Sequence, residues 1–566
     1  MRSDLSPTLT RQPTMDCTVV SCPGKVLLAG GYLVLSADHQ GFVVSTPSRF
    51  YTVVQSMPLD IDARSQSQFS VTVKSPQFVD GEWVYEAAKG GETGEWTVVQ
   101  DASNGAPRNP FVQLAVQSTL LLATALSSQT RFSDLVVTIV GANDFYSQSR
   151  QTDQHESFAH LGVKIKDVHK TGLGSSAAMV TSLCGALLLH WDKASRSAEP
   201  VSNSVEPISI QPAASSTQND AKNATTFNVT SPTEPTILSS SPPPPALFPH
   251  PQNFDVPDKD TLSLIHNLSQ YVHSLAQGKV GSGFDVSAAV YGSHVYRRFA
   301  VDCLGGLLED KDAASKTTSA GLLKVLSPMM NPLWTKKSTA ALVSPFALPP
   351  KTMLILADVD AGSNTPSMVG KVLSWKRQQS QQADELWNEL RKVNADLAES
   401  FASLSRAEKE GPQAYNDSIQ ALSTRTSNEW NSPLPFEHSV KYIKDMRNLM
   451  RRMGESSGVP IEPPEQTRLL DACAALPGVI GAGVPGAGGY DAVWVLVLCP
   501  SSDPSTTGSS LPEHQVEQLL RSWSEMSVRP LSRQAWIKGG VNTIETGLLE
   551  EQLDAVPGLR RVVAGF

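Results

Sequence analysis

Residues 170–178 read KTGLGSSAA, and the apolar run MVTSLCGALLL follows directly at 179–189. Gly172 and Gly174 permit a tight turn and let the backbone approach another group closely. The helix expected behind them offers unpaired N–H groups and the positive end of its dipole. The stretch therefore predicts an anion site, and a tight turn with no ligand is the alternative.

The residues of this loop indicate how a phosphate would be held. The lysine stands before the glycines, so the stretch is not the phosphate loop that ends in Gly-Lys-Ser/Thr. The serine hydroxyls and the first amides of the helix are suitable donors to phosphate oxygens. We expect the phosphate-binding residues to be Lys170, Gly172, Leu173, Gly174, Ser175, Ser176 and Ala177.

Three more glycine-containing stretches carry candidate polar residues. In SCPGKVLLAGGYLVL (21–35) a strand is expected to turn at Pro-Gly, just before Lys25. In GKVGSGFDVSAAVYG (278–292) Asp285 follows a Gly-Ser-Gly turn, and GVPGAGGYDA (483–492) is a glycine loop before a strand. Taken singly, these features are equally typical of a solvated lysine, a helix cap and a tight connection.

The chain has 566 residues, enough for two domains with separate cores. Short β-branched runs at 18–21, 42–46, 51–55, 69–73, 96–100 and 134–141 predict strands. Helical spacing is expected at 109–126 and 262–277, and again near 365–378, 383–408, 436–453 and 465–475, with a buried strand at 353–359. Since no regular βαβ period appears, we expect an α+β fold in both halves.

Changes in composition predict the domain boundaries. We expect a disordered tail at 1–15, and a first domain at 16–193 that continues at 259–345. The Ser/Thr/Pro-rich residues 194–258 between its two parts are expected to be a disordered insertion. A second domain is expected at 346–550, followed by a C-terminal tail at 551–566.

Charge and cysteine content exclude some classes of protein. The net charge of −9 disfavours a nucleic-acid binder, which needs a basic face. The six cysteines form no CxxC pairs, and no stretch reaches the ~20 apolar residues of a membrane span. We therefore expect a cytoplasmic protein without membrane or nucleic-acid partners; its oligomeric state is not predicted.

Taken together and in this order, the motifs resemble those of the GHMP small-molecule kinases. PGKVLLAGGYLVL is similar to that family's first motif, KTGLGSSAA to its phosphate-binding second motif and GVPGAGGYDA to its third. The stretches at 109–112, 143–148, 278–293, 358–375 and 457–472 are similar to the phosphomevalonate kinase branch of fungi and plants. Mevalonate kinases typically carry Glu-His where this chain has Gly31-Tyr32, which disfavours mevalonate as the acceptor.

The resemblance implies a two-domain GHMP kinase fold. Its N-terminal α+β domain would resemble a ribosomal-protein fold and its C-terminal α+β domain would be ferredoxin-like, with the active site in the cleft between them. It also implies ATP and Mg²⁺ as cofactors and 5-phosphomevalonate as the acceptor, in the mevalonate pathway of isoprenoid and sterol biosynthesis. Another kinase of the family, acting on mevalonate or a sugar, is the alternative, and a diphosphomevalonate decarboxylase or an inactive ligand sensor is a more distant one.

The same resemblance assigns roles to residues. Lys25 would lie between the donor and acceptor phosphates, and Asp285 would hold Lys25 or Mg²⁺; Ser175 or Ser176 would also reach the metal. Asn109 would lie near the adenine. The residues expected on the phosphomevalonate side are Tyr32, Ser147, Lys279, Gly362, Ser363, Gly486 and Gly488.

Overall fold

The computed structural model describes residues 17–57, 67–90, 94–103, 105–147, 157–197, 254–308, 317–336, 343–359, 365–432, 434–500, 510–531 and 547–564. All of them belong to one compact unit, which comprises residues 1–198 and 253–566. The expected tail at 1–15 and residues 198–253 of the expected insertion lie outside the described residues.

A large sheet organises the N-terminal part of this unit. Its strands pair in the order β5-β4-β3-β6-β2-β1-β14-β7, while β8 extends from β2 and β9 from β8. The alternation of buried and exposed residues along β3 shows the period of two that a half-buried strand requires. The strand bounds are β1 (Cys17–Ala29), β2 (Gln40–Ser56), β3 (Gln68–Lys74), β4 (Glu82–Gly90), β5 (Glu95–Asp101), β6 (Leu135–Gly141), β7 (Phe254–Asp255), β8 (His294–Arg297), β9 (Val343–Pro345) and β14 (Leu549–Glu551).

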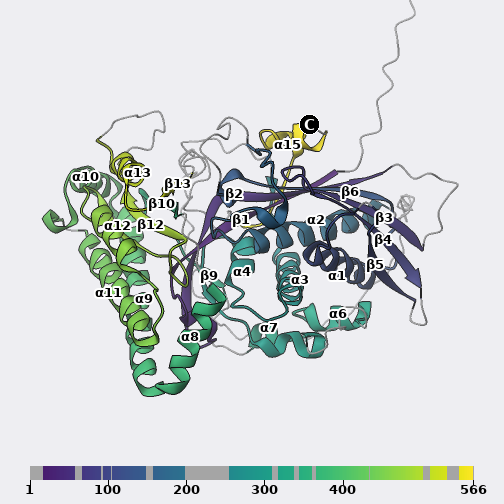
Figure 1. Ribbon diagram of the computed structural model, residues 1–566, viewed down its shortest axis with the longest axis horizontal. Coiled ribbons are helices and arrows are strands. Elements are labelled where there is room, and N and C mark those ends of the chain that lie inside the picture. Colours follow the sequence, from purple (N-terminus) through teal and green to yellow (C-terminus); the bar gives the residue numbers. More distant parts are fainter. Residues whose placement is uncertain are drawn as a thin grey trace, which may run out of the picture. The chain divides into compact units, whose positions relative to one another are not determined.

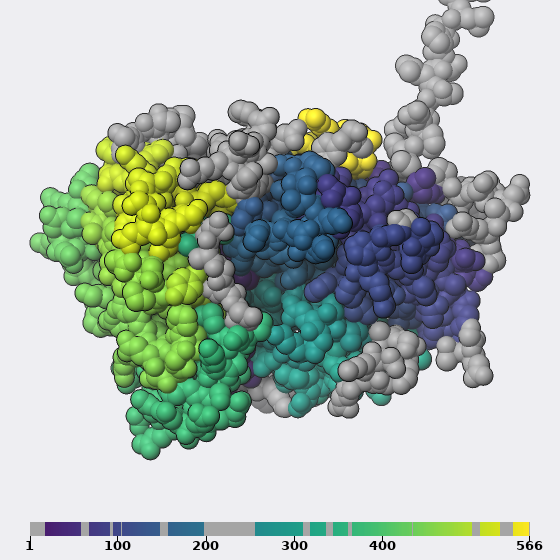
Figure 2. Space-filling model, in the orientation of Figure 1, coloured from purple at the N-terminus to yellow at the C-terminus, as the bar shows by residue number. Residues whose placement is uncertain are grey.

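Helices cover both faces of this sheet (Figure 1). On one face lie α1 (Pro110–Leu126), α2 (Ser175–Ser197), α3 (Lys259–Gln277) and α4 (Phe284–Tyr291), with α6 (Ser319–Leu326) and α7 (Leu333–Lys336) outside them. On the other face α15 (Leu559–Val563) buries Leu559 and Val562 against Val19, Val53 and Val140. The yellow C-terminal residues accordingly lie beside blue N-terminal ones in Figure 2.

A second sheet organises residues 352–530. Its strands, in the order β11-β12-β10-β13, are β11 (Val479–Gly483), β12 (Ala492–Leu498), β10 (Thr352–Val359) and β13 (Val528–Pro530). Met353 and Ile355 of β10 pack with Leu469 of α12 and Val516 of α13 in one core cluster, whereas Leu354 belongs to another. The helices are α8 (Thr365–Gln378), α9 (Ser380–Glu410), α10 (Pro412–Ser423), α11 (Phe436–Ser457), α12 (Pro464–Ala474) and α13 (Pro512–Ser522).

The α+β class is confirmed, and so are the helices expected from 365 onward. The turn expected at Pro23-Gly24 is wrong, because β1 runs through it and accommodates the pair with an irregularity in its pairing to β2 between Pro23 and Lys25. Neither β4 nor α10 was predicted. At the edges of the expected insertion, α2 continues to Ser197 and β7 already pairs with β14.

Candidate active site

A cavity of about 210 Å³ brings the four glycine-containing stretches together. It is lined from both parts of the fold, by the large sheet and its helices and by the loop before β12. Residues that decide its chemistry are Lys25, Tyr32, Gly172, Phe284, Gly486 and Asp491. Motifs that lie more than 450 residues apart in the sequence therefore share one site.

Lys25 is fixed against the glycine turn. Its backbone N–H donates to the carbonyl oxygen of Leu173 at 2.9 Å, and its Nζ donates to the carbonyl oxygen of Gly172 at 2.8 Å. Gly174 has a φ of +79°, and a Cβ there would lie 3.0 Å from Cε of Lys25. A glycine is required at this position both for its conformation and for the lysine stem that packs over it.

The electrostatics of Lys25 are set by its surroundings. Burial lowers the pKa of its ammonium group, and the negative charge of Asp285 opposes that shift. The Nζ also lies 5.4 Å from the centre of the Phe284 ring, within the range of a cation–π contact. Lys25 is thus a partly desolvated cation, and its attraction for an anion is stronger than in water because the effective dielectric constant is lower. Asp285 favours the protonated form of the lysine.

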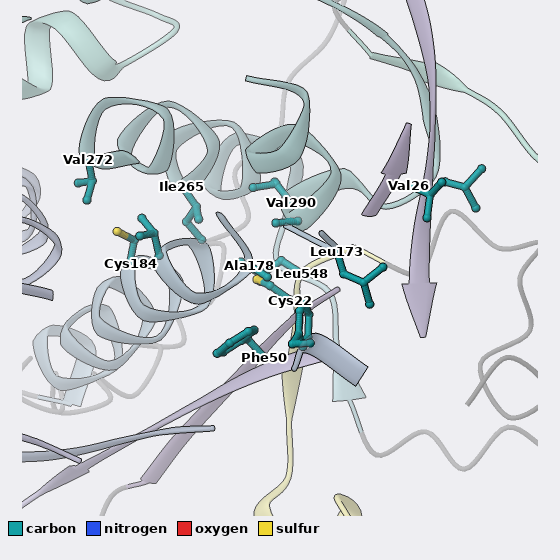
Figure 3. Packing of buried hydrophobic residues seen from close by; sticks show 14 of the residues in the cluster. Cys22, Val26, Phe50, Leu173, Ala178, Cys184, Ile265, Val272, Val290 and Leu548 are labelled. Carbon is teal, nitrogen blue, oxygen red and sulfur yellow. The ribbon is translucent and has the colours of Figure 1, made fainter. Parts of the chain in front are cut away.

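The glycine turn is anchored by the core and by the segment around Phe145. Leu173 is buried in the same hydrophobic core cluster as Cys22 and Leu548, all three of which Figure 3 labels. Thr171 is tied to the segment before it, since its N–H donates to the carbonyl oxygen of Phe145 at 3.2 Å and its hydroxyl donates to that of Asp144 at 2.5 Å. These contacts fix the position of the turn, whose backbone amides lie at the start of α2.

The two serines of the loop differ. The hydroxyl of Ser176 lies 3.1 Å from Nε2 of His273 on α3, so a described side chain already engages it. Ser175 begins α2 and is half-buried. Lys170 forms an isolated bridge with Tyr146, and its side chain is exposed. Of the expected phosphate residues, Gly172 and Leu173 line the cavity, whereas Lys170, Gly174, Ser175, Ser176 and Ala177 flank it.

The first and fourth stretches interlock through their backbones. A Cβ at Gly31 would overlap the carbonyl oxygen of Gly486, and the N–H of Gly486 donates to the carbonyl oxygen of Leu27 at 3.0 Å. Tyr32 is buried and its hydroxyl donates to the carbonyl oxygen of Ala487 at 2.8 Å. The Tyr32 hydroxyl therefore holds the fourth stretch in place, although its side chain also lines the cavity.

A buried ion-pair network supports the fourth stretch from behind. Gly488 packs against Ile461, and the next residue, Glu462, has a fully buried side chain that accepts hydrogen bonds from Arg447 and Arg451. Arg447 also pairs with Asp471 at 2.9 Å, so two guanidinium groups face two carboxylates and no buried charge is left unpaired. The network fixes the backbone against which the glycine loop rests.

Asp285 lies in the first turn of α4 but does not cap it. The N-cap is Gly283, and one oxygen of Asp285 accepts from the N–H of Val286 at 3.0 Å. The alternative that Asp285 is a helix cap is therefore wrong. Asp285 does not line the cavity, but its negative charge favours the protonated form of Lys25, which does, and adds to the effect of burial in raising the pKa of Tyr296.

Several expected site residues lie elsewhere. The side chain of Asn109 caps α1 by accepting from the N–H of Val112 at 3.3 Å, and Lys279 is exposed just after α3. The hydroxyl of Ser147 donates to Asp358 at 2.8 Å, which joins this segment to β10. None of the three lines the cavity. Gly362 and Ser363 lie outside the described residues.

Sequence reasoning missed part of the cavity wall. Thr171, Ser282 and Phe284 are immediate neighbours of residues that were singled out, so the quoted stretches contained them. Asp491 and Thr365 also line the cavity, and they lie in the quoted stretches 483–492 and 358–375. Neither was singled out, because nothing in the local sequence marks either side chain as facing a cavity.

The donor set fits a magnesium ion that is held chiefly by its substrate. Among the described residues, no group of three His, Cys, Asp or Glu side chains is arranged to hold a metal. Mg²⁺ in kinases is bound by one or two carboxylates together with substrate phosphates and water. Asp285 and the hydroxyl of Ser175 are the groups that could supply the protein's share of such a set.

Comparison with known proteins finds relatives over most of the chain. Residues 439–527 match the family model described as GHMP kinases C terminal. The chain is 33% identical over 509 residues to the phosphomevalonate kinase of Aspergillus fumigatus, covering 85% of this chain and 87% of that protein. It is also 33% identical over 545 residues to the peroxisomal phosphomevalonate kinase of Arabidopsis thaliana, covering 89% and 94%.

A solved structure shows the same fold. A Lin0012 protein from Listeria innocua superposes with a TM-score of 0.52 at 14% identity, covering 91% of this chain and 97% of that one. No helix among the described residues is long and apolar enough to cross a membrane. By its similarity to the fungal and plant proteins over most of its length, the chain belongs to the phosphomevalonate kinase family of GHMP kinases.

Proposed function

We propose that the protein transfers the γ-phosphoryl group of ATP to the phosphate of (R)-5-phosphomevalonate, giving ADP and (R)-5-diphosphomevalonate. The observation that carries this proposal is the position of Lys25, whose ammonium group binds the glycine turn before α2 at the wall of a cavity shared by all four motifs. Membership of the phosphomevalonate kinase family supports the choice of acceptor. The reaction belongs to the mevalonate pathway of isoprenoid and sterol biosynthesis.

The acceptor needs no strong base. A phosphate monoester has a second pKa near 6, so at pH 7 it is mostly a dianion and already a nucleophile. The obstacle is repulsion between two multiply charged anions, since each pair of unit charges ~4 Å apart costs about 4 kcal/mol at an effective dielectric constant near 20. Catalysis therefore consists of positioning and charge neutralisation.

We assign these tasks to named groups. The ammonium group of Lys25 would contact both phosphates, and Asp285 would favour its protonated form; the bond of Nζ to Gly172 and the charge of Asp285 support this assignment. The amides of the Gly172–Ser175 turn and the start of α2 hold the donor phosphates. The developing charge on the transferred group is met by fixed dipoles, which do not have to reorganise during the reaction.

Magnesium would be held by the ATP phosphates together with Asp285 and Ser175, and it would neutralise charge on the phosphate oxygens. Ser176 fits this role less well because its hydroxyl is engaged by His273.

The cavity accounts for the reacting ends of the two substrates. Its volume of about 210 Å³ is below the roughly 300–1,000 Å³ of typical small-molecule pockets. The backbone carbonyls and amides of the Gly486–Gly488 loop, opposite the glycine turn, form the wall where the acceptor would lie. Adenine and the far end of the acceptor extend beyond it.

The test is a paired-substrate assay with the purified full chain. ADP formation is measured with 5-phosphomevalonate, mevalonate and galactose in parallel, and carbon dioxide release is recorded alongside. We expect turnover with 5-phosphomevalonate alone and no carbon dioxide. Turnover with mevalonate or sugar at a comparable kcat/KM would reassign the acceptor, and carbon dioxide release would indicate a decarboxylase. Absence of any turnover would favour the ligand sensor.

We further propose a cytoplasmic location. The acidic, cysteine-poor sequence is compatible with it, while the plant relative carries the word peroxisomal in its name. Fluorescence microscopy of the full chain tagged separately at each end distinguishes the two compartments, because a tag can mask a terminal targeting signal at one end only.

A further inference from the structure

The turn before α4 has an unusual set of backbone partners. Its four successive carbonyl oxygens, from Val280 to Gly283, all accept hydrogen bonds from side chains. The donors come from two places: Gln270 on α3, and the residues Tyr296 and Arg298 at the end of β8. A turn held at every peptide in this way has little freedom to tilt.

The distances show that the bonds to this turn are strong. Arg298 Nη2 lies 2.6 Å from the oxygen of Gly281 and 3.3 Å from that of Val280. The hydroxyl of Tyr296 lies 2.6 Å from the oxygen of Ser282, and Nε2 of Gln270 lies 2.7 Å from that of Gly283. Ser282 and its neighbour Phe284 line the cavity, so the held turn is part of the candidate active site.

Arg298 also reaches a second segment of the site. Its Nη1 donates to the carbonyl oxygen of Leu35 at 2.7 Å, and Leu35 lines the cavity as well. One guanidinium group therefore joins the end of the first motif to the turn that carries Asp285. The planar, forked donors of arginine suit this task, whereas the single ammonium group of lysine would satisfy only one side.

The charge of Arg298 is not neutralised by the described protein. No carboxylate among those residues lies within 4.0 Å of its guanidinium group, and its Nε is buried without a hydrogen-bond acceptor. Burial lowers the pKa of this side chain. A half-buried cation without a counterion is unfavourable for the free protein, so a role in fold stability alone does not account for it.

We propose that Arg298 is a positioning residue for phosphoryl transfer: it clamps the 280–283 turn to Leu35, which fixes Asp285, and its uncompensated charge helps the cavity retain anionic substrates. This inference rests on the proposed function and deepens it. The arginine touches neither substrate. It acts through the backbone of the cavity wall and through its field.

The adjacent Arg297 provides a matched control. Successive side chains of a strand point to opposite faces, and Arg297 accordingly donates to the carbonyl oxygen of Ala37 at 3.0 Å, away from the turn. Its Nε is likewise buried without an acceptor. Arg297→Ala and Arg298→Ala thus remove the same side chain from neighbouring positions, and only the second removes contacts to the cavity wall.

The experiment compares these variants in three measurements. We expect Arg298→Ala to lower kcat/KM for 5-phosphomevalonate about 10- to 100-fold, the effect of lost charged hydrogen bonds, with Arg297→Ala within about threefold of wild type. Methylguanidinium at millimolar concentration should restore several-fold of the lost activity in Arg298→Ala alone. The activity of Arg298→Lys should be lower than that of Arg298→Ala in the presence of methylguanidinium. Equal activities in the two alanine variants, or equal stimulation of both, would overturn the proposal.

Two further measurements separate the role of Arg298 from effects on folding and from the identity of the acceptor. Tyr296→Phe removes only the hydroxyl that binds Ser282, and we expect it to lower kcat about 3- to 10-fold with a decrease in Tm that leaves the protein folded at the assay temperature; wild-type kcat would count against the clamp. Calorimetric titration with ATP needs no turnover, and the Kd should rise about tenfold in Arg298→Ala only. If the wild type shows no turnover with 5-phosphomevalonate but Arg298→Ala and Arg297→Ala still differ in their Kd for ATP, the proposed acceptor is wrong and the positioning role stands. An equal Kd for ATP in the two variants would reject the charge role.

Discussion

Replacing Lys25 by methionine separates its charge from its packing. The aliphatic stem of Lys25 lies over Gly174, where a Cβ would be 3.0 Å from Cε and 3.1 Å from Cγ. Methionine retains an unbranched stem of similar length, so the glycine turn keeps its cover. The hydrogen bond from Nζ to the carbonyl oxygen of Gly172 and the positive charge are lost. Any change in turnover then reports on the ammonium group.

The size of the effect follows from the charges that the ammonium group faces. A unit charge ~4 Å from each of two phosphates contributes about 4 kcal/mol per pair at an effective dielectric constant near 20. Part of this is offset by desolvation, and part is already present in the ground state. If about 3–4 kcal/mol is realised only when the phosphates approach each other, kcat falls about 10²- to 10³-fold. ATP affinity, by contrast, should change less than about tenfold.

A double-mutant cycle with Asp285→Asn tests whether the carboxylate acts through the lysine. Steady-state ADP release gives kcat for wild type, both single variants and the double variant, and calorimetry gives the Kd for ATP. We expect Asp285→Asn to be slow in the wild-type background and to cause no further loss in Lys25→Met, because the two groups then act as one unit. Fully additive losses would refute this coupling, and wild-type kcat in Lys25→Met would remove the lysine from the site.

Three shorter predictions follow from other contacts. Gly174→Ala should lower kcat at least about tenfold, because its new Cβ would displace Lys25. Gly172→Ala introduces similar backbone strain, but no protein atom lies within 4 Å of its new Cβ, so it should mainly raise the KM for ATP. Ser147→Ala removes one hydrogen-bond donor to Asp358, so chemical denaturation should show a free energy of unfolding about 1–3 kcal/mol lower, with kcat within about threefold of wild type. A rise of about tenfold in the KM for 5-phosphomevalonate at unchanged stability would instead assign the hydroxyl to the substrate. Burial lowers the pKa of His294 to about 4, so as the pH falls below about 6.5 the unfolded chain binds a proton at this residue before the folded chain does. The free energy of unfolding should therefore decrease by about 3 kcal/mol between pH 6.5 and 4, and His294→Gln should abolish this part of the decrease.

The elements with a strong local pattern were predictable. The helix behind KTGLGSSAA, the long helices after residue 365 and the buried strand β10 each have an uninterrupted period of 3.6 or a continuous apolar run. β4 was missed because EWVYEAAKG mixes a strand-like alternation with residues of high helix propensity, and only its pairing with β3 and β5 decides the outcome. The Pro-Gly pair in β1 suggested a turn, but the bulge opposite β2 absorbs it.

The candidate site was predictable in its motifs and not in its contacts. Sequence identified Lys25 and the glycine turn as partners in one site, and the structure joins them by the bond to Gly172. It could not show that Tyr32 donates to Ala487 or that Ser147 donates to Asp358, since both pairs depend on how separate parts of the chain pack together. Such long-range contacts leave no periodic trace in the sequence.

Close backbone approaches provide a rigid frame in which a small number of cations would act. Gly31 touches Gly486, and Lys25 binds Leu173 through its main chain, so peptide groups fix the stretches that line the cavity relative to one another. Peptide dipoles that are fixed before the substrates arrive do not need to reorganise as charge develops. They carry no net charge, however, and the protein as a whole is negative at −9. Attraction of two phosphates must then come from local cations, Lys25 at the wall and Arg298 behind it, and their loss should impair turnover while the rigid backbone frame persists.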